Sequence, residues 1–231
     1  MRVAAENVIA SGRDSDLVDL GGGRVLRRPR IPRPLDAEAE VMRRVRAAGY
    51  PVPEVFEVRS DGMVIARVEG PTMLRDLAAH PWRAGGHART LADLHRRLHA
   101  LAAGDDLRPT FGRTGPDDVL VHGDLHPDNV LLSPAGPVVI DWANAGRGPA
   151  GADVADCWLL LASAEAPVGP VMRAVVAVLR RRFLAVFLRH AGRVEAARHL
   201  ETALRRRLAD TNISAEERAR MRGVVARHGR G

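Results

Sequence analysis

The chain has 231 residues, of which 46% are hydrophobic and 27% charged, a composition that excludes disorder over most of its length. The N-terminus lacks the apolar core of a signal peptide, no apolar stretch reaches membrane-spanning length, and the single Cys157 has no disulfide partner, so we expect a cytoplasmic protein without a membrane partner. All 35 basic residues are arginine and the net charge is +7, but aromatic residues make up only 3%, so we expect a solvated arginine-rich surface and no nucleic-acid partner.

The first part of the chain has the pattern of a small antiparallel sheet accompanied by one helix. Short runs of β-forming residues alternate with turn residues, and three successive glycines predict a tight hairpin turn. The predicted strands cover residues 7–10, 16–20, 24–28, 55–58 and 63–68. After a proline-rich linker, Val41, Met42 and Val45 give helical periodicity to residues 35–48, and Asp36 is placed to cap the start of this helix.

The chain after residue 70 has mostly helical patterns. Leucines at three- and four-residue spacing predict a helix over residues 88–101. His95 and His99 lie four residues apart on it and form either a metal pair or, since no Glu or Cys joins them, partly buried structural histidines. Three more helices are predicted from residue 170, with breaks near Gly192 and Thr211 and a capping box that begins at Ser214.

One turn in this second part carries residues suited to catalysis. Residues 122–129 have the sequence HGDLHPDN, and they lead into the short apolar runs 130–132 and 138–140, which predict a β-hairpin. This hairpin would place Asn129 and Asp141 at adjacent strand ends, where an amide oxygen and a carboxylate suit Mg²⁺. Asp124 is then available to accept a proton from an attacking hydroxyl.

Two other interpretations of this turn stay open from the residues alone. It is a surface turn that happens to be rich in His, Asp and Asn, or it belongs to a His/Asp metal-hydrolase cluster. A hydrolase would need a second such cluster, and the sequence shows none.

The turn resembles the catalytic loop of protein-kinase-like phosphotransferases, H-x-D-x-x-x-x-N followed by a strand that ends in a metal-binding Asp. The glycine after His122 and the Asp-Trp pair at 141–142 make it more similar to the aminoglycoside phosphotransferase and choline kinase branch. The resemblance implies an α+β, bilobal protein-kinase-like fold, with a nucleotide-binding lobe over residues 1–69 and a larger, mostly helical catalytic and acceptor-binding lobe over 70–231. It also implies the roles of four side chains: Asp124 as base, Asn129 and Asp141 as Mg²⁺ ligands, and His126 as an auxiliary phosphate contact.

The same resemblance assigns an ion pair to the nucleotide phosphates. Arg27 takes the place of the lysine that contacts these phosphates in the family, with Arg28 as the second choice and a solvated strand charge as the plain alternative. Glu38, on the inward stripe of its helix, is the expected partner of Arg27. Glu40 competes for that place, and a solvent-exposed helix charge is again the alternative.

Backbone groups complete the predicted nucleotide site. The small residues Ser11, Gly12 and Ser15 would let N–H groups approach the phosphates, although the loop lacks the protein-kinase glycine pattern. Ala66 and Val68 fall in the segment that would form the hinge, whose backbone would hydrogen-bond the nucleobase.

One acidic residue after the hairpin has a structural role in the resemblance. Residues 148–155 resemble the family segment G-x-P-x-x-D-x-A, in which Asp153 would brace the backbone of the catalytic loop. A helix N-cap explains the same residue equally well.

These residues together predict transfer of the γ-phosphoryl group of ATP or GTP to a hydroxyl of a small molecule, with Mg²⁺ as cofactor. The alternative is a catalytically silent nucleotide-binding regulatory protein of the same fold, which the arginine at the lysine position would suit. A third interpretation is an arginine-rich adaptor for nucleic acid or a membrane surface. Few carboxylates occur in the second lobe, so we expect a small hydroxylated metabolite or another antibiotic as acceptor, rather than a polycationic aminoglycoside.

Overall fold

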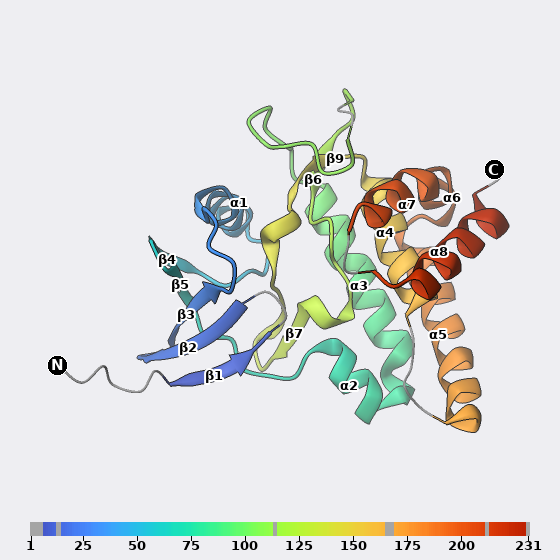
Figure 1. Cartoon of the computed structure of the whole chain (residues 1–231), viewed down its shortest axis with the longest axis horizontal. Coiled ribbons are helices and arrows are strands. Elements are labelled where there is room, and N and C mark those ends of the chain that lie inside the picture. The colour runs from blue at the N-terminus through green and yellow to red at the C-terminus, as the bar shows by residue number, and fades with distance from the viewer. Residues whose placement is uncertain (1–6, 13–14, 113–114, 165–168, 211–212, 230–231) are drawn as a thin grey trace. The chain divides into compact units, whose positions relative to one another are not determined.

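The computed structural model describes residues 7–12, 15–112, 115–164, 169–210 and 213–229 (Figure 1). They form a mixed α+β fold, as predicted, and divide into two compact units. We name Met1–Gly70 with Leu131–Ala143 the sheet unit, and Pro71–Val130 with Asn144–Gly231 the helical unit. The sequence predicted one boundary between residues 69 and 70; the segment Leu131–Ala143 packs with the sheet unit because the N–H of Val139 donates to the carbonyl of Pro51 at 2.8 Å.

The sheet unit contains a five-stranded antiparallel sheet in the order β1-β2-β3-β5-β4. Its strands are β1 (Val8–Ser11), β2 (Ser15–Gly21), β3 (Arg24–Pro29), β4 (Val55–Arg59) and β5 (Gly62–Ala66). The five predicted strands are confirmed, although the last one ends at Ala66 instead of residue 68. Buried Val18, Leu26 and Val64 pack together on one face and hold the three middle strands.

Helix α1 (Asp36–Ala47) has the buried stripe that the sequence predicts. Met42 and Val45 are buried, and the helix contacts β4. The predicted cap is wrong, because the N-cap residue is Leu35 and no side chain caps the helix. Asp36 is instead the first helical residue, where its charge still favours the positive end of the helix dipole.

The predicted hairpin is present as β7 (Val130–Ser133) and β8 (Gly136–Val139), which form a separate two-stranded sheet. Its turn is tighter than predicted, since Ser133 and Gly136 already belong to the strands. Gly70 lies against it with φ +130°, and a Cβ there would meet the carbonyl oxygen of Leu132 at 2.1 Å, so only glycine fits.

The helical unit is built around a buried central helix. Its elements are α2 (Met73–Ala79), α3 (Ala84–His99), α4 (Ala150–Ser163), α5 (Pro170–Ala191), α6 (Arg193–Arg198), α7 (Leu200–Leu208), α8 (Ala215–His228), and the small sheet of β6 (Val119–Val121) and β9 (Gly146–Gly148). Helix α4 is buried over most of its length and contacts α5, α6, α7 and α8, while α3 packs on α5 (Figure 1). No helix in the described part of the chain is long and apolar enough to cross a membrane.

Several boundaries in the helical unit differ from the sequence prediction. Helix α3 begins four residues earlier, at Ala84, and β6 and β9 were not predicted because three-residue strands carry too little pattern. The segment after residue 170 contains four described helices instead of three, with an additional break at His199. The predicted break at Thr211 lies outside the described residues. The predicted cap is confirmed, since the Oγ of Ser214 accepts from the N–H of Glu217 at 3.1 Å.

Candidate active site

The turn that carries Asp124 is held by buried residues on both sides. It connects β6 to a single 3₁₀ turn, Pro127–Asn129, and its His122 and Leu125 are at most 1% exposed. Gly123 has φ +73°, and a Cβ there would meet the carbonyl oxygen of Asn144 at 2.8 Å. Glycine is therefore required before Asp124, whose carboxylate is anchored in a defined direction.

Asn129 and His126 both approach the same oxygen of Asp124. The side-chain nitrogen of Asn129 donates to the backbone oxygen of Asp124 at 2.8 Å and to its Oδ2 at 3.2 Å. The Nδ1 of His126 accepts from the N–H of Asp128 at 3.3 Å, and its Nε2 lies 3.6 Å from Oδ2 of Asp124 and 3.3 Å from the side-chain nitrogen of Asn129. Because Asn129 uses its nitrogen on Asp124, its carbonyl oxygen is left to serve as a ligand.

The second oxygen of Asp124 is held by Arg207, a residue that the sequence analysis missed. Its Nη2 donates to Oδ1 of Asp124 at 2.6 Å, and it also donates through Nε, at 2.8 Å, and Nη2 to the buried Asp156 of α4. Arg206 binds Asp156 as well, at 3.0 Å. A sequence signal existed: residues 200, 203, 204 and 207 form the buried stripe of α7, so an arginine faces inward.

This network sets the charge state of Asp124. Burial alone would raise the pKa of its carboxyl, but the hydrogen bond from His126 and the charge of Arg207 outweigh burial and hold that pKa well below its ordinary value. Burial likewise opposes the charge of Arg207, yet Asp156 and Asp124 raise the pKa of the guanidinium above its ordinary value. Asp124 is therefore an ionised hydrogen-bond acceptor at neutral pH.

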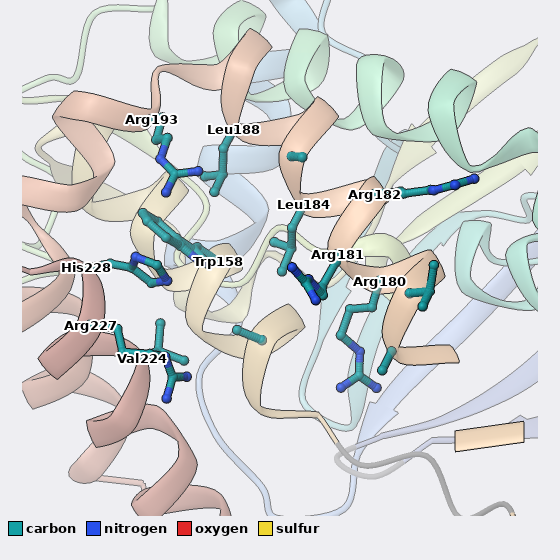
Figure 2. A pocket seen from close by; sticks show the side chains of 14 residues that line it. Trp158, Arg180, Arg181, Arg182, Leu184, Leu188, Arg193, Val224, Arg227 and His228 are labelled. Carbon is teal, nitrogen blue, oxygen red and sulfur yellow. The ribbon is translucent and has the colours of Figure 1, made fainter. Parts of the chain in front are cut away.

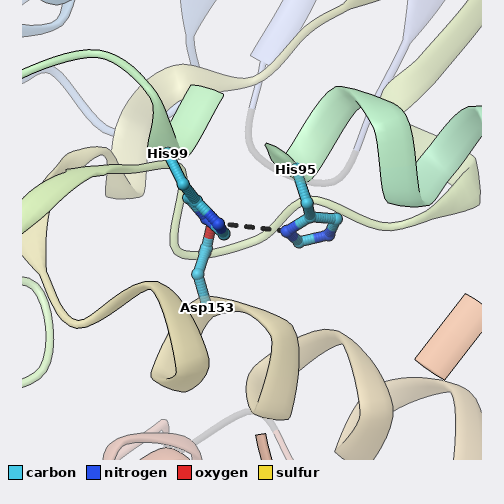
Figure 3. Close-up of side chains that lie close together, drawn as sticks. All are labelled: His95, His99 and Asp153. Atoms are coloured by element: carbon cyan, nitrogen blue, oxygen red, sulfur yellow. Dashed lines mark hydrogen bonds and ion pairs between the residues drawn. The ribbon is translucent and has the colours of Figure 1, made fainter. Parts of the chain in front are cut away.

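Asp153 of α4 braces the turn that carries Asp124, and Figure 3 shows its side chain beside His95 and His99. Its Oδ1 accepts from the N–H of Gly123 at 2.7 Å, and its Oδ2 accepts from the N–H of His122 at 3.2 Å and lies 2.9 Å from Nε2 of His99. The bracing role that the resemblance implied is confirmed. The alternative of a helix N-cap is wrong, because Pro149 is the N-cap residue of α4.

His95 and His99 belong to this brace as the structural histidines that the sequence predicted; His95 is fully buried and His99 is partly buried. Nε2 of His95 lies 3.2 Å from the carbonyl oxygen of Leu125, and its Nδ1 lies 3.6 Å from Oδ2 of Asp153. Burial lowers the pKa of His99, and the bond to Asp153 opposes that shift. The two rings and the carboxylate are close enough to hold a metal ion, but Asp153 already uses both oxygens on the turn.

Replacing Asp153 by alanine should destabilise the protein strongly, because it leaves two buried N–H groups and a buried histidine without their acceptor. We expect a loss of about 3–5 kcal/mol, which lowers the melting temperature by roughly 6–20 °C. The fold lowers the pKa of the Asp153 carboxyl, because the bonds from His95 and His99 outweigh the effect of burial. The stabilisation by Asp153 is therefore complete above the pKa of an unfolded aspartate, about 3.9, and is lost as the pH falls below that pKa. Thermal unfolding of Asp153→Ala beside the exposed control Asp93→Ala checks this, and equal melting temperatures would contradict it.

In the sheet unit, Arg27 and Glu38 form the predicted ion pair. The two bonds are 2.5 Å from Nη1 to Oε1 and 3.2 Å from Nη2 to Oε2, a bidentate arrangement. The competing residues are accounted for, since Arg28 pairs with Asp61 at the surface and Glu40 is exposed. Burial raises the pKa of Glu38, against the charge of Arg27, so the pair depends on close contact.

Asp141 follows β8 in an uncommon backbone conformation. Its φ is +63°, and it is the single non-glycine residue with a positive φ among the residues described. The buried Trp142 fixes this turn, because its indole N–H donates to the carbonyl of Val139 at 3.1 Å and its ring packs edge-on against Tyr50. The Asp141 carboxylate is consequently directed outward, 41% exposed and 4.0 Å from Nη2 of Arg27.

The predicted backbone contacts to the nucleotide are only partly described. The N–H of Gly12 donates to the carbonyl of Ser15 at 2.9 Å, and Ser11 ends β1, while the two residues at the loop tip, 13 and 14, lie outside the described residues. The N–H of Ala66 donates to Glu54 within the sheet, so this donor is already used. A role for Val68 stays a prediction.

A basic hollow of about 840 Å³ lies between α4, α5, α6 and α8 of the helical unit (Figure 2). Its basic side chains are Arg180, Arg181, Arg182, Arg193, Arg227 and His228, and no acidic residue lines it within the described part of the chain. The guanidinium of Arg193 covers the ring of Trp158, which is only 3% exposed. Trp158 lies two residues after Asp156 and thus on nearly the opposite face of α4, so this hollow is separate from Asp124.

Comparisons with known proteins agree on one family. Residues 7–118 and 105–199 match the phosphotransferase enzyme family, whereas no curated protein is a significant match. Among solved structures, an aminoglycoside-3'-phosphotransferase of type VIII is 26% identical, with a TM-score of 0.57 over 95% of this chain and 90% of that chain.

Two further structures show the same fold at lower identity. Aminoglycoside phosphotransferase APH(4)-Ia is 18% identical, with a TM-score of 0.65 over 99% of this chain and 95% of that one. A choline/ethanolamine kinase family protein from Mesorhizobium loti is 16% identical, with a TM-score of 0.59 over 97% and 86%. Because the family match covers most of the chain, the protein belongs to the phosphotransferase enzyme family and is a small-molecule kinase.

Proposed function

We propose that the protein transfers the γ-phosphoryl group of ATP or GTP to a hydroxyl of a small molecule, and that Asp124 orients this hydroxyl and receives its proton. The observation that carries the proposal is the ionised, anchored carboxylate of Asp124, with Asn129 and His126 directed at one of its oxygens. Phosphoryl transfer depends mainly on positioning and on charge stabilisation, and this turn supplies the positioning.

Asn129 and Asp141 have the donor atoms that Mg²⁺ requires. Both offer hard oxygen ligands, the carbonyl oxygen of Asn129 is left over after its bonds to Asp124, and the Asp141 carboxylate is exposed. Bound there with the nucleotide, Mg²⁺ would neutralise charge on the phosphates. We assign these two residues as its protein ligands, and water and phosphate oxygens as the remaining ones.

The sheet unit would bind the nucleotide. Arg27, held by Glu38, presents a permanent charge to the phosphates, and an arginine does so with a planar group that binds two oxygens at once. Backbone groups near Ser11, Gly12 and Ser15 would contribute on the phosphate side. The carbonyl of Ala66 and the backbone of Val68 would meet the nucleobase.

The acceptor is proposed to be a small hydroxylated compound that is not a polycation. Similar proteins have been solved with hygromycin B, streptomycin and gentamicin. In this chain, however, two arginines, Arg206 and Arg207, lie beside Asp124 and Asp156 and leave no surplus negative charge for amines there. Use of a nucleotide and a buried, unpaired Cys157 both suit a cytoplasmic site of action.

Thermal unfolding with and without Mg-ATP, followed by a screen of hydroxyl compounds for nucleotide consumption, tests the proposal. We expect stabilisation by Mg-ATP and turnover with at least one acceptor; the panel includes the three aminoglycosides above as polycationic members. Stabilisation without turnover on any compound would favour a silent nucleotide-binding protein. Salt-sensitive retention on heparin or anionic vesicles, with no response to nucleotide, would favour an adaptor.

A further inference from the structure

We infer that Arg207 is a positioning residue for Asp124, holding its Oδ1 so that Oδ2 is the oxygen presented to the acceptor hydroxyl. This inference rests on the proposed function, and it concerns a residue 83 positions later in the chain. Arg207 would not touch the reacting atoms. It would act through the direction of the Asp124 carboxylate.

The geometry of Arg207 supports a fixed orientation. Asp156 holds the guanidinium by two donors, Nε and Nη2, and Nη2 reaches Oδ1 of Asp124 with its other proton. Arg207 is 9% exposed and Asp156 1% exposed, so neither side chain has room to swing into solvent. A planar guanidinium clamped at one end gives the bond at its other end a defined direction.

The two oxygens of Asp124 consequently have different surroundings. Oδ1 is occupied by the strong, charge-assisted bond to Arg207 at 2.6 Å. Oδ2 receives a longer bond from Asn129 at 3.2 Å and lies 3.6 Å from His126. Oδ2 therefore keeps the weaker contacts, on the side of Asn129 and His126, and is the oxygen suited to take up a hydroxyl proton.

Burying an arginine between two aspartates costs desolvation free energy, and packing alone does not require such a charged group. Replacing buried ion pairs by apolar residues of similar volume is often neutral or stabilising. Arg207 occupies the apolar stripe of α7, where a leucine or methionine would fit the pattern of Leu200, Ala203 and Leu204. The position is thus better explained by its bond to Asp124 than by the stability of α7.

The test uses the full chain and a double variant, Arg207→Met with Asp156→Leu, which removes the arginine together with the buried aspartate that clamps it, while Asp124 keeps its contacts with Asn129 and His126. We expect it to fold, to keep the KM values for nucleotide and acceptor within about threefold, and to lose roughly 10–100-fold in kcat. A single Arg207→Lys variant keeps the charge but not the planar geometry, and its kcat should lie between that of the wild type and that of the double variant. If the double variant does not fold, the kcat of Arg207→Lys still tests the inference.

A matched control and a spectroscopic probe accompany the kinetics. Arg205→Gln removes an exposed guanidinium of the same helix, which donates to Oγ1 of Thr202 at 3.3 Å, and it should behave as the wild type. The chain has no glutamine and four asparagines, Asn7, Asn129, Asn144 and Asn212, so its side-chain amide region in a ¹⁵N–¹H spectrum is simple. The Asn129 amide bonds Oδ2 of Asp124 and should shift in the double variant.

The outcomes separate this inference from the proposed function. A folded double variant with wild-type kcat and an unmoved Asn129 amide would overturn the positioning role. A fall in kcat with nearly unchanged KM values in the double variant, together with a partial recovery of kcat in Arg207→Lys, would support it. If the wild type phosphorylates no acceptor, the proposed function fails, and the Asn129 amide alone then decides whether Arg207 sets the orientation of Asp124.

Discussion

Replacement of Asp124 by asparagine is expected to lower kcat by roughly 10²–10⁴-fold while leaving the affinity for Mg-ATP almost unchanged. Asparagine keeps the size of the side chain but cannot accept the hydroxyl proton. Nucleotide binding is proposed to use Arg27, Glu38, Asn129 and Asp141, none of which is altered. Alanine at the same position should also spare binding and remove turnover.

Turnover is measured by nucleotide consumption with the best acceptor, and binding by the thermal shift that Mg-ATP produces. Asp105→Asn is the matched control, since it makes the same change of charge in the helical unit at a fully exposed side chain. Wild-type turnover in Asp124→Asn would refute the assignment of the base. Loss of nucleotide binding in that variant would instead give Asp124 a role in the nucleotide site.

Replacement of Asp141 by asparagine is expected to abolish stabilisation by Mg-nucleotide. With nucleotide at about 100 times its Kd the wild type should gain roughly 2.7 kcal/mol, or about 5–11 °C, whereas the variant should gain almost nothing. The reason is that Asp141 would be the charged protein ligand of Mg²⁺, and the neutral amide cannot replace its charge. Asparagine is preferred to alanine because it tolerates the left-handed backbone at this position.

Alanine at position 141 should remove Mg-nucleotide binding as well, with about 1–2 kcal/mol of added backbone strain. Thermal shifts with ATP, with and without Mg²⁺, distinguish the two effects, because strain lowers the melting temperature in every condition. Asp61→Asn is the control in the sheet unit, an exposed carboxylate that pairs only with Arg28 among the bonds described. A full Mg²⁺-dependent shift in Asp141→Asn would remove this residue from the metal site.

The sequence by itself determined the elements whose pattern is local. The periodicity of α1 placed Glu38 on the inward stripe, and the two apolar residues before Arg27 made it a better match than Arg28 to the family's lysine position; the structure confirms this pair. The hairpin that precedes Asp141 followed from two short β-forming runs. These predictions succeeded because helical and strand periods specify which side chains face inward.

Only the tertiary structure decided which inward-facing residues meet. Asp153 and Asp156 lie in an apolar run and Arg207 lies on an apolar stripe, but no local pattern states that α7 delivers Arg207 to Asp124. The brace of His95, His99 and Asp153 is likewise formed across two helices far apart in the chain. Helix packing depends on the shapes of whole faces, which a single sequence does not reveal, and buried charges then pair with whatever partner that packing provides.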